Sequence, residues 1–411
     1  MKNLILLFTL IGSYTTLKAT DIYVNNSGNA GTYATISAAL TASSNGDILY
    51  ISPNSVYDEA INIDKSVTLV SSIAGVLFTI EDVVTITGAP NMEIKMIGAK
   101  LTSTFLFNPG TSSLTNKAKF FLIGSETENV YLDYDNLEFH ALYNNLNSIK
   151  LMHGEVIGCE TRGNISVTEG SAVDNGDTLS IIGNVVGGQL YWKSDDHYFL
   201  MSNNYVKRGL TVNNYLNHST NLNLITNSTI TENNYNYSSS WPASYSGSAN
   251  LPMNAVVEIN KMYSTSSTNY NAETNISILN CIIIQEYTGS YKANTYTSKI
   301  NYYGSSSNNR VTTDAPTKYC SQLRVAYTTP PVIDNYGRCN DIGQINKGIA
   351  SIEYYDIDLT RNDIGTYGGP RSINNYIDTA SGNGRVYDLN IPFQIWSGQT
   401  PQVKAKSVHT K

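Results

Sequence analysis

Charged side chains are scarce in this chain. Only 14% of its 411 residues are Asp, Glu, Lys or Arg, and the formal net charge is −7. Nucleic acid is therefore a poor partner, because binding to phosphates needs a basic face. Tyrosine is abundant instead, at 30 residues, and Asn, Ser and Thr are frequent. Such a polar, uncharged and aromatic surface suits an extracellular protein that contacts sugars, although most of these residues would simply coat any soluble β-protein.

Cysteine is rare as well, with four residues in the chain. No Cys-x-x-Cys pair and no Cys/His spacing predicts a zinc site. Cys159 and Cys281 lie in strand-like sequence, where a buried free thiol is the expected state. Cys320 and Cys339 lie near each other in a loop-rich region, and we predict that they form the only disulfide, since export permits oxidation.

Long apolar runs are absent except at the N-terminus. There, "LILLFTLIG" follows Lys2 and precedes the small residue Ala19. This pattern is typical of a secretory signal peptide, which we assign to residues 1–19. No later run approaches the roughly 18 apolar residues of a membrane-spanning helix. The sequence therefore predicts a protein that is secreted or held at the cell surface, with no membrane span.

Short strand-like segments recur in residues 163–230. "GNISV", "GQLYW" and "GLTV" align with each other, as do "LSII", "YFLM" and "LNLI", and then "NVV", "NYV" and "STI". Parallel strands cannot be joined by a tight turn, so a coil in which each strand pairs with its copy one repeat later explains the pattern. The predicted fold is all-β, a single-stranded right-handed parallel β-helix over residues 20–370.

One corner of the predicted coil has a clear chemical character. The second strands of the repeats align on Ile181, Leu200 and Leu224. The corner that follows them holds Asn184, Asn203 and Asn227, with Gly154 one coil earlier. Gly and Asn tolerate the left-handed backbone of a sharp turn, and stacked asparagines can hydrogen-bond to one another. We therefore predict a structural asparagine ladder at this corner.

The ends of the coil and two insertions complete the predicted organisation. "TYATISAALTAS" (32–43) places Tyr33, Ile36, Ala39 and Leu40 on one helical face, so we expect a helix that caps the N-terminal end. Residues 231–275 and 286–318 are rich in Tyr, Asn and Ser and predict loop insertions. Residues 371–411 alternate like strands, and we assign them to a small C-terminal β appendage or cap.

Two segments carry a family resemblance. The first is residues 32–72, with Gly46, Asp47, Tyr57, Glu59, Lys65 and Leu69, and the second is residues 345–370, with Asp356, Asp358, Arg361, Asp363, Gly365 and Gly368. They resemble the opening and the closing coil of secreted bacterial proteins of the pectin-lyase-like superfamily. The resemblance implies the same right-handed parallel β-helix, with substrate lying along the face of the first strands. It leaves the activity open, because the superfamily includes lyases, hydrolases, epimerases, binders and adhesins.

The repeat alignment locates that face here. Alternation along the first strands turns Tyr131 and Tyr191 outward in one column, and Asp133 and Lys193 outward in the next. One neighbouring corner, "KSDDH", adds Asp195, Asp196 and His197, and the other adds Arg162, Lys207 and Arg208. A groove lined with tyrosine between acidic and basic corners suits an acidic glycan. The predicted substrate-binding residues are Tyr131, Tyr191, Lys207, Arg162 and Trp241, the last of them in the 231–275 insertion.

Two functions fit this groove. The first is recognition of an extracellular polysaccharide by a monomeric protein. The alternative is a polysaccharide lyase, in which Asp133, Asp195 and Asp196 would hold calcium. In that lyase, Lys193, His197 or Arg208 would be the catalytic base that takes the proton from a uronate. Because the lyase motif R-x-x-R-x-P and the polygalacturonase residue set are absent, the sequence favours recognition.

Overall fold

A computed structural model gives the fold of the chain. It describes residues 19–168, 178–193 and 198–207, and beyond them only separate strands and short segments. These segments are 210–214, 223–226, 229–231, 257–261, 276–279, 282–286, 300–303, 310–313, 317–318, 321–325, 335–336, 345–346, 355–356, 358–361, 363, 365–369, 371–376, 385–390 and 404–408.

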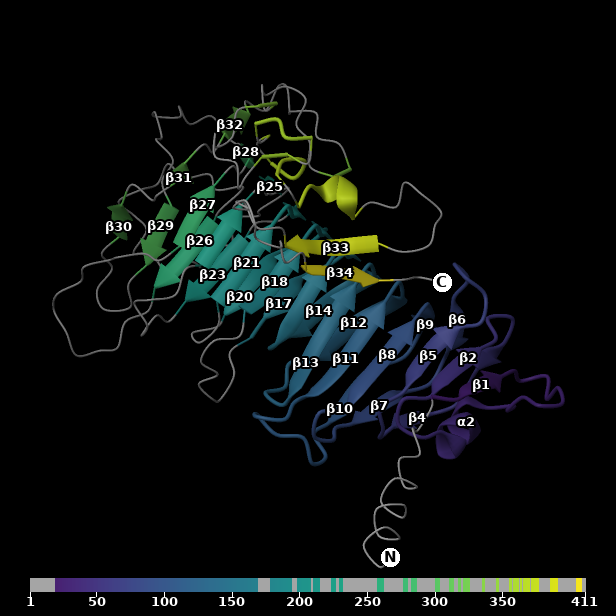
Figure 1. The fold of residues 1–411 in the computed structure, drawn as a ribbon. Coiled ribbons are helices and arrows are strands. Elements are labelled where there is room, and N and C mark those ends of the chain that lie inside the picture. Colours follow the sequence, from purple (N-terminus) through teal and green to yellow (C-terminus); the bar gives the residue numbers. More distant parts are fainter. Residues whose placement is uncertain are drawn as a thin grey trace, which may run out of the picture.

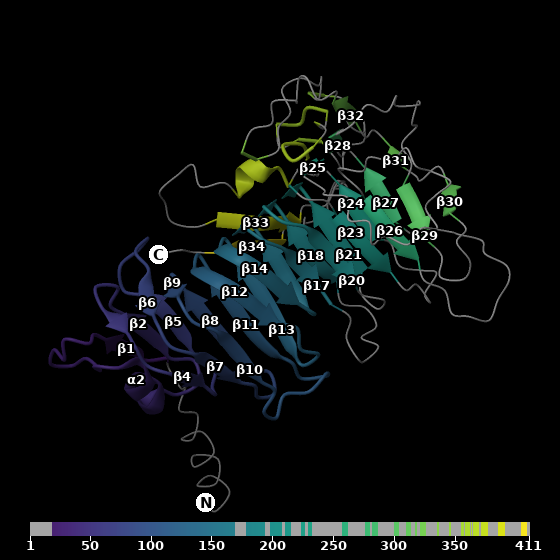
Figure 2. The same cartoon turned by 180° about the vertical axis from the view of Figure 1, so that it is seen from behind.

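One parallel sheet runs along the whole molecule (Figure 1, and from behind in Figure 2). We call it sheet A. Its strands, in spatial order, are β1 (Asp21–Val24), β2 (Ile48–Ile51), β5 (Thr68–Ser71), β8 (Glu93–Ile97), β11 (Ala118–Ile123), β13 (Leu137–Leu142), β15 (Gly154–Ile157), β18 (Thr178–Ile182), β21 (Tyr198–Ser202), β24 (Asn223–Thr226), β27 (Ile276–Leu279) and β31 (Thr317–Lys318). Each strand pairs with the strand that the chain forms one repeat later, so the order in space follows the order in sequence.

Sheet B lies alongside sheet A and receives the chain after each sheet A strand from β2 onward. Its strands begin with β3 (Val56–Tyr57), β6 (Phe78–Ile80), β9 (Ala99–Leu101), β12 (Glu126–Leu132) and β14 (Asn145–Leu151). From there, two short strands replace one long strand, as in β16 (Glu160–Thr161) with β17 (Ile165–Val167), β19 (Val185–Val186) with β20 (Leu190–Lys193), and β22 (Tyr205–Val206) with β23 (Leu210–Asn214). The predicted repeat of three short strands is confirmed in this region.

The same pattern continues into the later part of the chain. Sheet B gains β25 (Thr229–Thr231), β26 (Val257–Lys261), β28 (Ile282–Glu286), β29 (Ile300–Tyr303), β30 (Arg310–Thr313) and β32 (Ser321–Val325). A third, short parallel sheet holds β4 (Ile61–Ile63), β7 (Val84–Thr87) and β10 (Phe105–Asn108). β26 and β29 fall inside the ranges that the sequence indicates as insertions, and they pair with each other within sheet B. The described architecture is thus mostly parallel β, with few helices, and is compatible with a parallel β-helix.

Apolar side chains from both sheets fill the interior. On sheet A, alternate residues such as Phe120, Leu122 and Phe139 are fully buried, and the rings of Phe120 and Phe139 stack with their centres 5.6 Å apart. On sheet B, Val130 and Leu132 are also fully buried. Burial of about 25 cal/mol for each Å² of apolar surface makes this continuous core the main source of stability.

The alignment of the second strands needs one correction. Ile181 pairs with Met201, whereas Leu200 pairs with Ser180 and with Leu224. Met201 therefore fills the interior beside Ile181, and Leu200 points outward. Matching apolar to apolar residues fails here because the outer face of sheet A is itself apolar at this end.

The corner after sheet A contains a buried ladder, but its members differ from the predicted set. Asn184 continues to Asn204, whose Oδ1 accepts hydrogen bonds from the backbone N–H (3.1 Å) and the Nδ2 (2.9 Å) of Asn184. Asn203 instead occupies the preceding left-handed position, with φ 57°, and Gly154 pairs with Phe139 inside sheet A. Asn203 was misplaced because adjacent positions of the corner, Asn203 and Asn204, both hold asparagine, and Gly154 was misplaced because it begins β15 and the corner of that repeat follows the strand, at Gly158 and Cys159. Asn227 lies outside the described residues.

The ladder uses both asparagine and cysteine side chains. Asn184 Oδ1 accepts a hydrogen bond from the backbone N–H of Cys159 (2.8 Å). Cys159 Sγ accepts one from the backbone N–H of Asn144 (3.5 Å). Asn144 Oδ1 in turn accepts one from the backbone N–H of Ser125 (2.8 Å). Cys159 is free and buried, as predicted, and burial raises the pKa of its thiol to about 12. The other three cysteines, including the predicted Cys320–Cys339 pair, lie outside the described residues.

The helix α2 (Ile36–Ala42) covers the N-terminal end beside β1 and β4 (Figure 1), as predicted. Its apolar face, Ile36, Ala39 and Leu40, is buried, whereas Tyr33 lies before the helix and is exposed. Glu59 accepts from the N–H groups of Ile36 (2.7 Å) and Ser37 (3.0 Å) at the helix start. Lys65 Nζ donates to the carbonyls of Leu40 (2.9 Å) and Ser43 (3.1 Å) at its end. The motif residues Glu59 and Lys65 thus satisfy groups that every helix end leaves open.

The C-terminal segment packs on the outside of the stack. η3 (Ile373–Asn375) and Tyr376 lie against the corner of the middle repeats, and Asn203 Nδ2 donates to the carbonyls of Thr366 (2.9 Å) and Gly368 (2.6 Å). β33 (Arg385–Asn390) and β34 (Lys404–Val408) form a separate antiparallel pair. None of the described helices has the length and apolar character needed to cross a membrane.

Candidate functional site

An outward column of polar and aromatic side chains crosses four neighbouring strands of sheet B. The strand register aligns Tyr131 on β12, Lys150 on β14, Ser166 on β17 and Tyr191 on β20. Tyr131 is 53% exposed and Tyr191 is 36% exposed. The predicted orientation of the two tyrosines is confirmed, because the residues on either side of each are buried in the core. We call this set the tyrosine column.

Lys150 is the member of the column that the sequence did not identify. Its Nζ lies 2.5 Å from Oδ2 of Asp133, which follows β12 on the neighbouring strand. The predicted metal ligand Asp133 therefore already holds a cation, and calcium would have to displace the lysine. The repetition of Val130–Tyr131–Leu132 in Ile149–Lys150–Leu151 was the sequence signal that could have placed Lys150 here.

The predicted basic corner forms beside the tyrosine column. Thr161 pairs with Val186 and Val186 pairs with Val206, so Thr161 and Val206 occupy equivalent positions two repeats apart. Arg162 and Lys207 are the residues that directly follow them. Arg162 Nη2 lies 3.4 Å from Oε1 of Glu128, and both side chains are exposed to solvent. Lys207 Nζ lies 5.4 Å from the centre of the Tyr205 ring. Cations are thus present along one side of the column.

The remaining predicted site residues are not placed by the structure. His197, Arg208, Asp195, Asp196 and Trp241 lie outside the described residues. Lys193 is described by its backbone, as the last residue of β20 opposite Asn213. Among the residues that the structure describes, no group of three His, Cys, Asp or Glu side chains could hold a metal ion.

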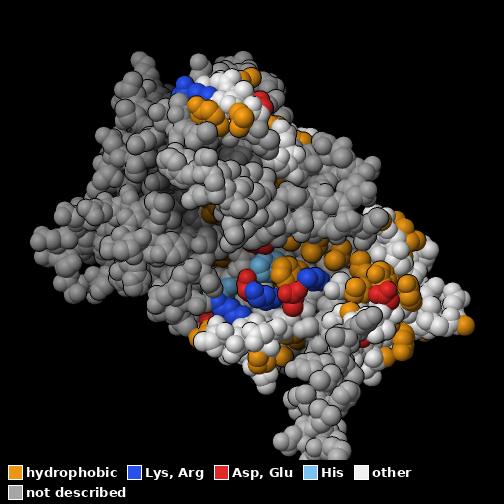
Figure 3. Space-filling view, viewed as in Figure 1, with side chains coloured by type: hydrophobic (Ala, Val, Ile, Leu, Met, Phe, Trp, Pro, Cys, Tyr) orange, Lys and Arg blue, Asp and Glu red, His pale blue; other side chains and the backbone are white. Residues whose placement is uncertain are grey.

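A second group of charged residues lies on the outer face of sheet A and was missed at the sequence level. Figure 3 shows these side chains gathered over β8, β11 and β13. We call them the charge cluster: Glu93, Lys95, Lys119, Glu138, His140 and Glu155. Lys119 pairs with Glu138 and His140 pairs with Glu155 across neighbouring repeats, so the strand register is needed to assemble the cluster.

His140 is the centre of the charge cluster. Its Nε2 lies 3.0 Å from Glu138 Oε1, and its Nδ1 lies 3.0 Å from Glu155 Oε1. The ring also stacks on Phe121, with the two centres 4.2 Å apart and the planes 7° apart. Burial by itself lowers the pKa of His140, but the hydrogen bonds to Glu138 and Glu155 outweigh it, and the net pKa is raised. The same contact with His140, together with Lys119, lowers the pKa of Glu138 to about 2 despite its partial burial.

The two surfaces differ in what they offer a ligand. In the charge cluster, the carboxylates of Glu138 and Glu155 already hold His140, which is buried. In the tyrosine column, two aromatic rings are exposed on the outer face of a parallel sheet. The column is therefore the better candidate for a binding site. No family model, no curated protein and no solved structure matches this chain.

Proposed function

We propose that this protein is a secreted right-handed parallel β-helix of the pectin-lyase-like type, and that it recognises an acidic extracellular polysaccharide on the tyrosine column. The observation that carries the proposal is the alignment of two exposed tyrosines with Lys150 between them. Three strand spacings separate Tyr131 from Tyr191, which corresponds to about 14 Å. A sugar chain running along the stack would meet an aromatic ring at each end of this span.

The charges near the column suit a uronate polymer. Lys150 lies inside the span, and Arg162 and Lys207 follow along its side. The ion pairs of Lys150 and Arg162 are at least partly open to solvent, so a ligand carboxylate can compete for these two cations. Such exposed pairs contribute about 1 kcal/mol or less, which keeps the cost of rearrangement small.

Recognition is favoured over β-elimination by the state of Asp133. A calcium ion bound there would lie beside the positive charge of Lys150, whereas a uronate carboxylate would be attracted to that charge. The lyase remains the alternative through Lys193, His197 or Arg208 as base, with Asp195 and Asp196 as calcium ligands. If the protein is a lyase whose base is Lys193, Lys193→Ala should abolish turnover, whereas in a binding protein the same change should only weaken glycan binding.

Affinity electrophoresis in gels containing polygalacturonate, alginate or hyaluronate tests the proposal, with dextran as the uncharged control. Wild-type protein should be retarded by at least one uronate polymer. Tyr131→Ala and Tyr191→Ala should each weaken that binding about fivefold, because loss of one ring contact costs about 1 kcal/mol. Tyr23→Ala is the matched control, since Tyr23 is 51% exposed but lies on β1 of sheet A.

Two results would count against the proposal. Binding that the Tyr131/Tyr191 double variant leaves unchanged would exclude the tyrosine column, and no retardation by any uronate polymer would exclude acidic glycans. Ultraviolet absorbance of unsaturated products, measured with and without calcium on the same polymers, separates the two functions. Product formation that depends on calcium would replace recognition by the lyase alternative.

A further inference from the structure

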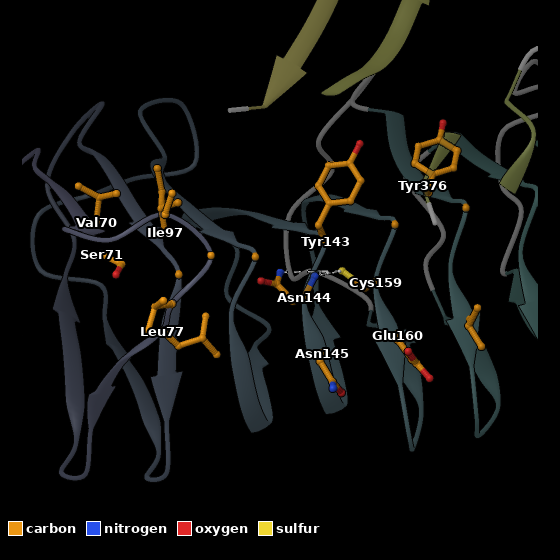
Figure 4. A pocket seen from close by; sticks show the side chains of 18 of the residues that line it. Val70, Ser71, Leu77, Ile97, Tyr143, Asn144, Asn145, Cys159, Glu160 and Tyr376 are labelled. Atoms are coloured by element: carbon orange, nitrogen blue, oxygen red, sulfur yellow. Dashed lines mark hydrogen bonds between the residues drawn. The ribbon is translucent and has the colours of Figure 1, made fainter. Parts of the chain in front are cut away.

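A cavity of about 440 Å³ opens at the corner that follows sheet A (Figure 4). Gly98 and Gly124, at the left-handed position after β8 and β11, form its floor. The segment 70–77, which connects β5 to β6, forms one wall with its apolar side chains. Figure 4 shows the rings of Tyr143 and Tyr376 standing together on the opposite side. None of these residues belongs to the tyrosine column.

Tyr143 is an unusual residue for its backbone position. Six successive corners adopt a left-handed φ between 54° and 69°, and the residues there are Gly98, Gly124, Tyr143, Gly158, Gly183 and Asn203. Glycine takes this conformation freely and asparagine tolerates it, whereas a bulky residue pays on the order of 1–2 kcal/mol. Backbone strain of this kind is often found at functional sites. The strain therefore needs a compensating role for the Tyr143 side chain.

The neighbouring repeats are adapted to the two rings. A Cβ atom at Gly158 would lie 2.8 Å from Cδ1 of Tyr143, and a Cβ atom at Gly183 would collide with the ring of Tyr376. The ring centres of Tyr143 and Tyr376 lie 6.4 Å apart. Glycine at both positions thus allows the rings to lie directly on the backbone. This arrangement fixes an aromatic wall beside the open glycine floor.

We propose that this cavity binds one neutral sugar unit, at a site separate from the polysaccharide face. Its volume falls within the range of small-molecule sites, and its lining combines aromatic rings and apolar side chains with the polar side chains of Asn145 and Glu160. Glu160 is the single ionisable carboxylate among the described lining residues, and no lysine or arginine is among them. A uronate would therefore meet only negative charge here, in contrast to the cations around the tyrosine column.

Saturation-transfer NMR with three uncharged probes, methyl β-glucoside, methyl β-galactoside and N-acetylglucosamine, tests the site, and glucuronate is the charged control. In the full-length protein carrying Tyr131→Ala and Tyr191→Ala, which removes the rings of the tyrosine column, at least one uncharged probe should bind at millimolar concentration, and glucuronate should bind at least tenfold more weakly. Tyr143→Asn should reduce binding at least fivefold. The substitution follows the chain's own precedent, since Asn203 occupies the same position two repeats after Gly158.

The stability of Tyr143→Asn separates a sugar site from a mere anchor for the C-terminal segment. If Tyr143 serves binding, its left-handed backbone is strained in the wild type, and asparagine relieves that strain. The Tyr143→Asn variant should therefore unfold at the same urea concentration as the wild type or at a higher one. A second variant, Ile73→Ser with Val76→Ser, changes exposed wall residues and should also weaken binding at least threefold. Tyr131→Ala should leave this binding unchanged.

Three results would overturn the inference. The first is that none of the three uncharged probes binds, and the second is that glucuronate binds as well as they do. The third is that the Ile73/Val76 variant binds like the wild type. If Tyr143→Asn lowers stability, its loss of binding can follow from a displaced C-terminal segment. The Ile73/Val76 variant alone then tests whether the cavity binds the sugar. None of these results bears on the uronate polymers, so the failure of this site and the failure of the proposed function are distinguishable.

Discussion

The outer faces of sheets A and B carry their charges in opposite ways. On sheet A, His140 is buried between Glu138 and Glu155, and lysines on β8 and β11 pair with glutamates of the same cluster. On sheet B, two exposed tyrosines flank one ion pair, between Lys150 and Asp133. A buried charge that loses its partner is costly, whereas an exposed ring can still gain contacts. The comparison assigns stability to the first face and recognition to the second.

The largest effect should come from His140→Ala. The substitution leaves the buried Glu155 without its histidine partner, and it also removes His140 from Glu138. Breaking a buried ionic contact typically costs about 3 kcal/mol, and urea unfolding at pH 6 measures the loss. The matched change on the other face, Tyr131→Ala, should alter the free energy of unfolding by less than about 0.5 kcal/mol. Equal losses on both faces would remove the distinction between them.

The pH dependence of stability should also trace to the charge cluster. The folded-state pKa of His140 is raised above 6.5, so its contribution is complete below that pH and is lost as the pH rises through the raised value. The pKa of Glu138 is lowered from 4.5 to about 2, so its contribution is complete above pH 4.5 and is lost as the pH falls toward 2. The wild type should therefore exceed His140→Gln in stability most clearly between about pH 4.5 and 6.5.

Urea unfolding of the wild type and His140→Gln at pH 5.5 and pH 9 checks this prediction. The difference in unfolding free energy between the two proteins should be smaller at pH 9 than at pH 5.5, because the contribution of a histidine with a raised pKa is lost as the pH rises. A difference that stays constant would mean that the charge on His140 contributes nothing. The same experiment on Lys150→Gln is the control on sheet B, and its difference should not change over this range.

The orientation of sheet B strands was predictable from the sequence because their alternation is strict. Val130 and Leu132 point inward on either side of Tyr131, and Leu190 and Trp192 do the same for Tyr191. The charge cluster was not predictable, because His140 depends on Glu155 from the next strand and on Phe121 from the previous one. Only the register between repeats brings these residues together.

Sheet A misled the alignment for a related reason. Near the C-terminal segment, its outward residues Leu142, Ile157 and Ile182 are buried under Tyr376, so both faces of the sheet are apolar. Apolar character then no longer tells inside from outside, and Leu200 was matched to Ile181 when its true partner is Ser180. The packing of residues 371–376 on this face is a long-range effect that local sequence does not reveal.

A pair of ring removals sharpens the comparison with an effect of intermediate size. Phe121→Ala removes the ring stacked on His140 and should lower the free energy of unfolding by about 1 kcal/mol or more, without changing glycan binding. Tyr191→Ala should do the reverse, weakening glycan binding about fivefold while stability stays constant. Urea unfolding measures the stability of both variants, and affinity electrophoresis measures their glycan binding. A variant that lowers both properties would show that the two faces are coupled.

The smallest effect is expected from Lys150→Ala, which removes the only lysine of the tyrosine column. The pair with Asp133 is partly open to solvent, and such pairs contribute about 1 kcal/mol or less to stability. Binding of a uronate polymer should weaken severalfold and should become less sensitive to salt, since one cation that meets the ligand is gone.

The Lys150→Ala variant also frees the Asp133 carboxylate. If added calcium then restores binding to Lys150→Ala but has no effect on the wild type, Asp133 can serve as a cation ligand once its lysine is absent, and the wild-type face works through lysine instead of calcium. If calcium strengthens binding equally in both proteins, the metal acts elsewhere, and the lyase alternative through Asp195 and Asp196 gains support.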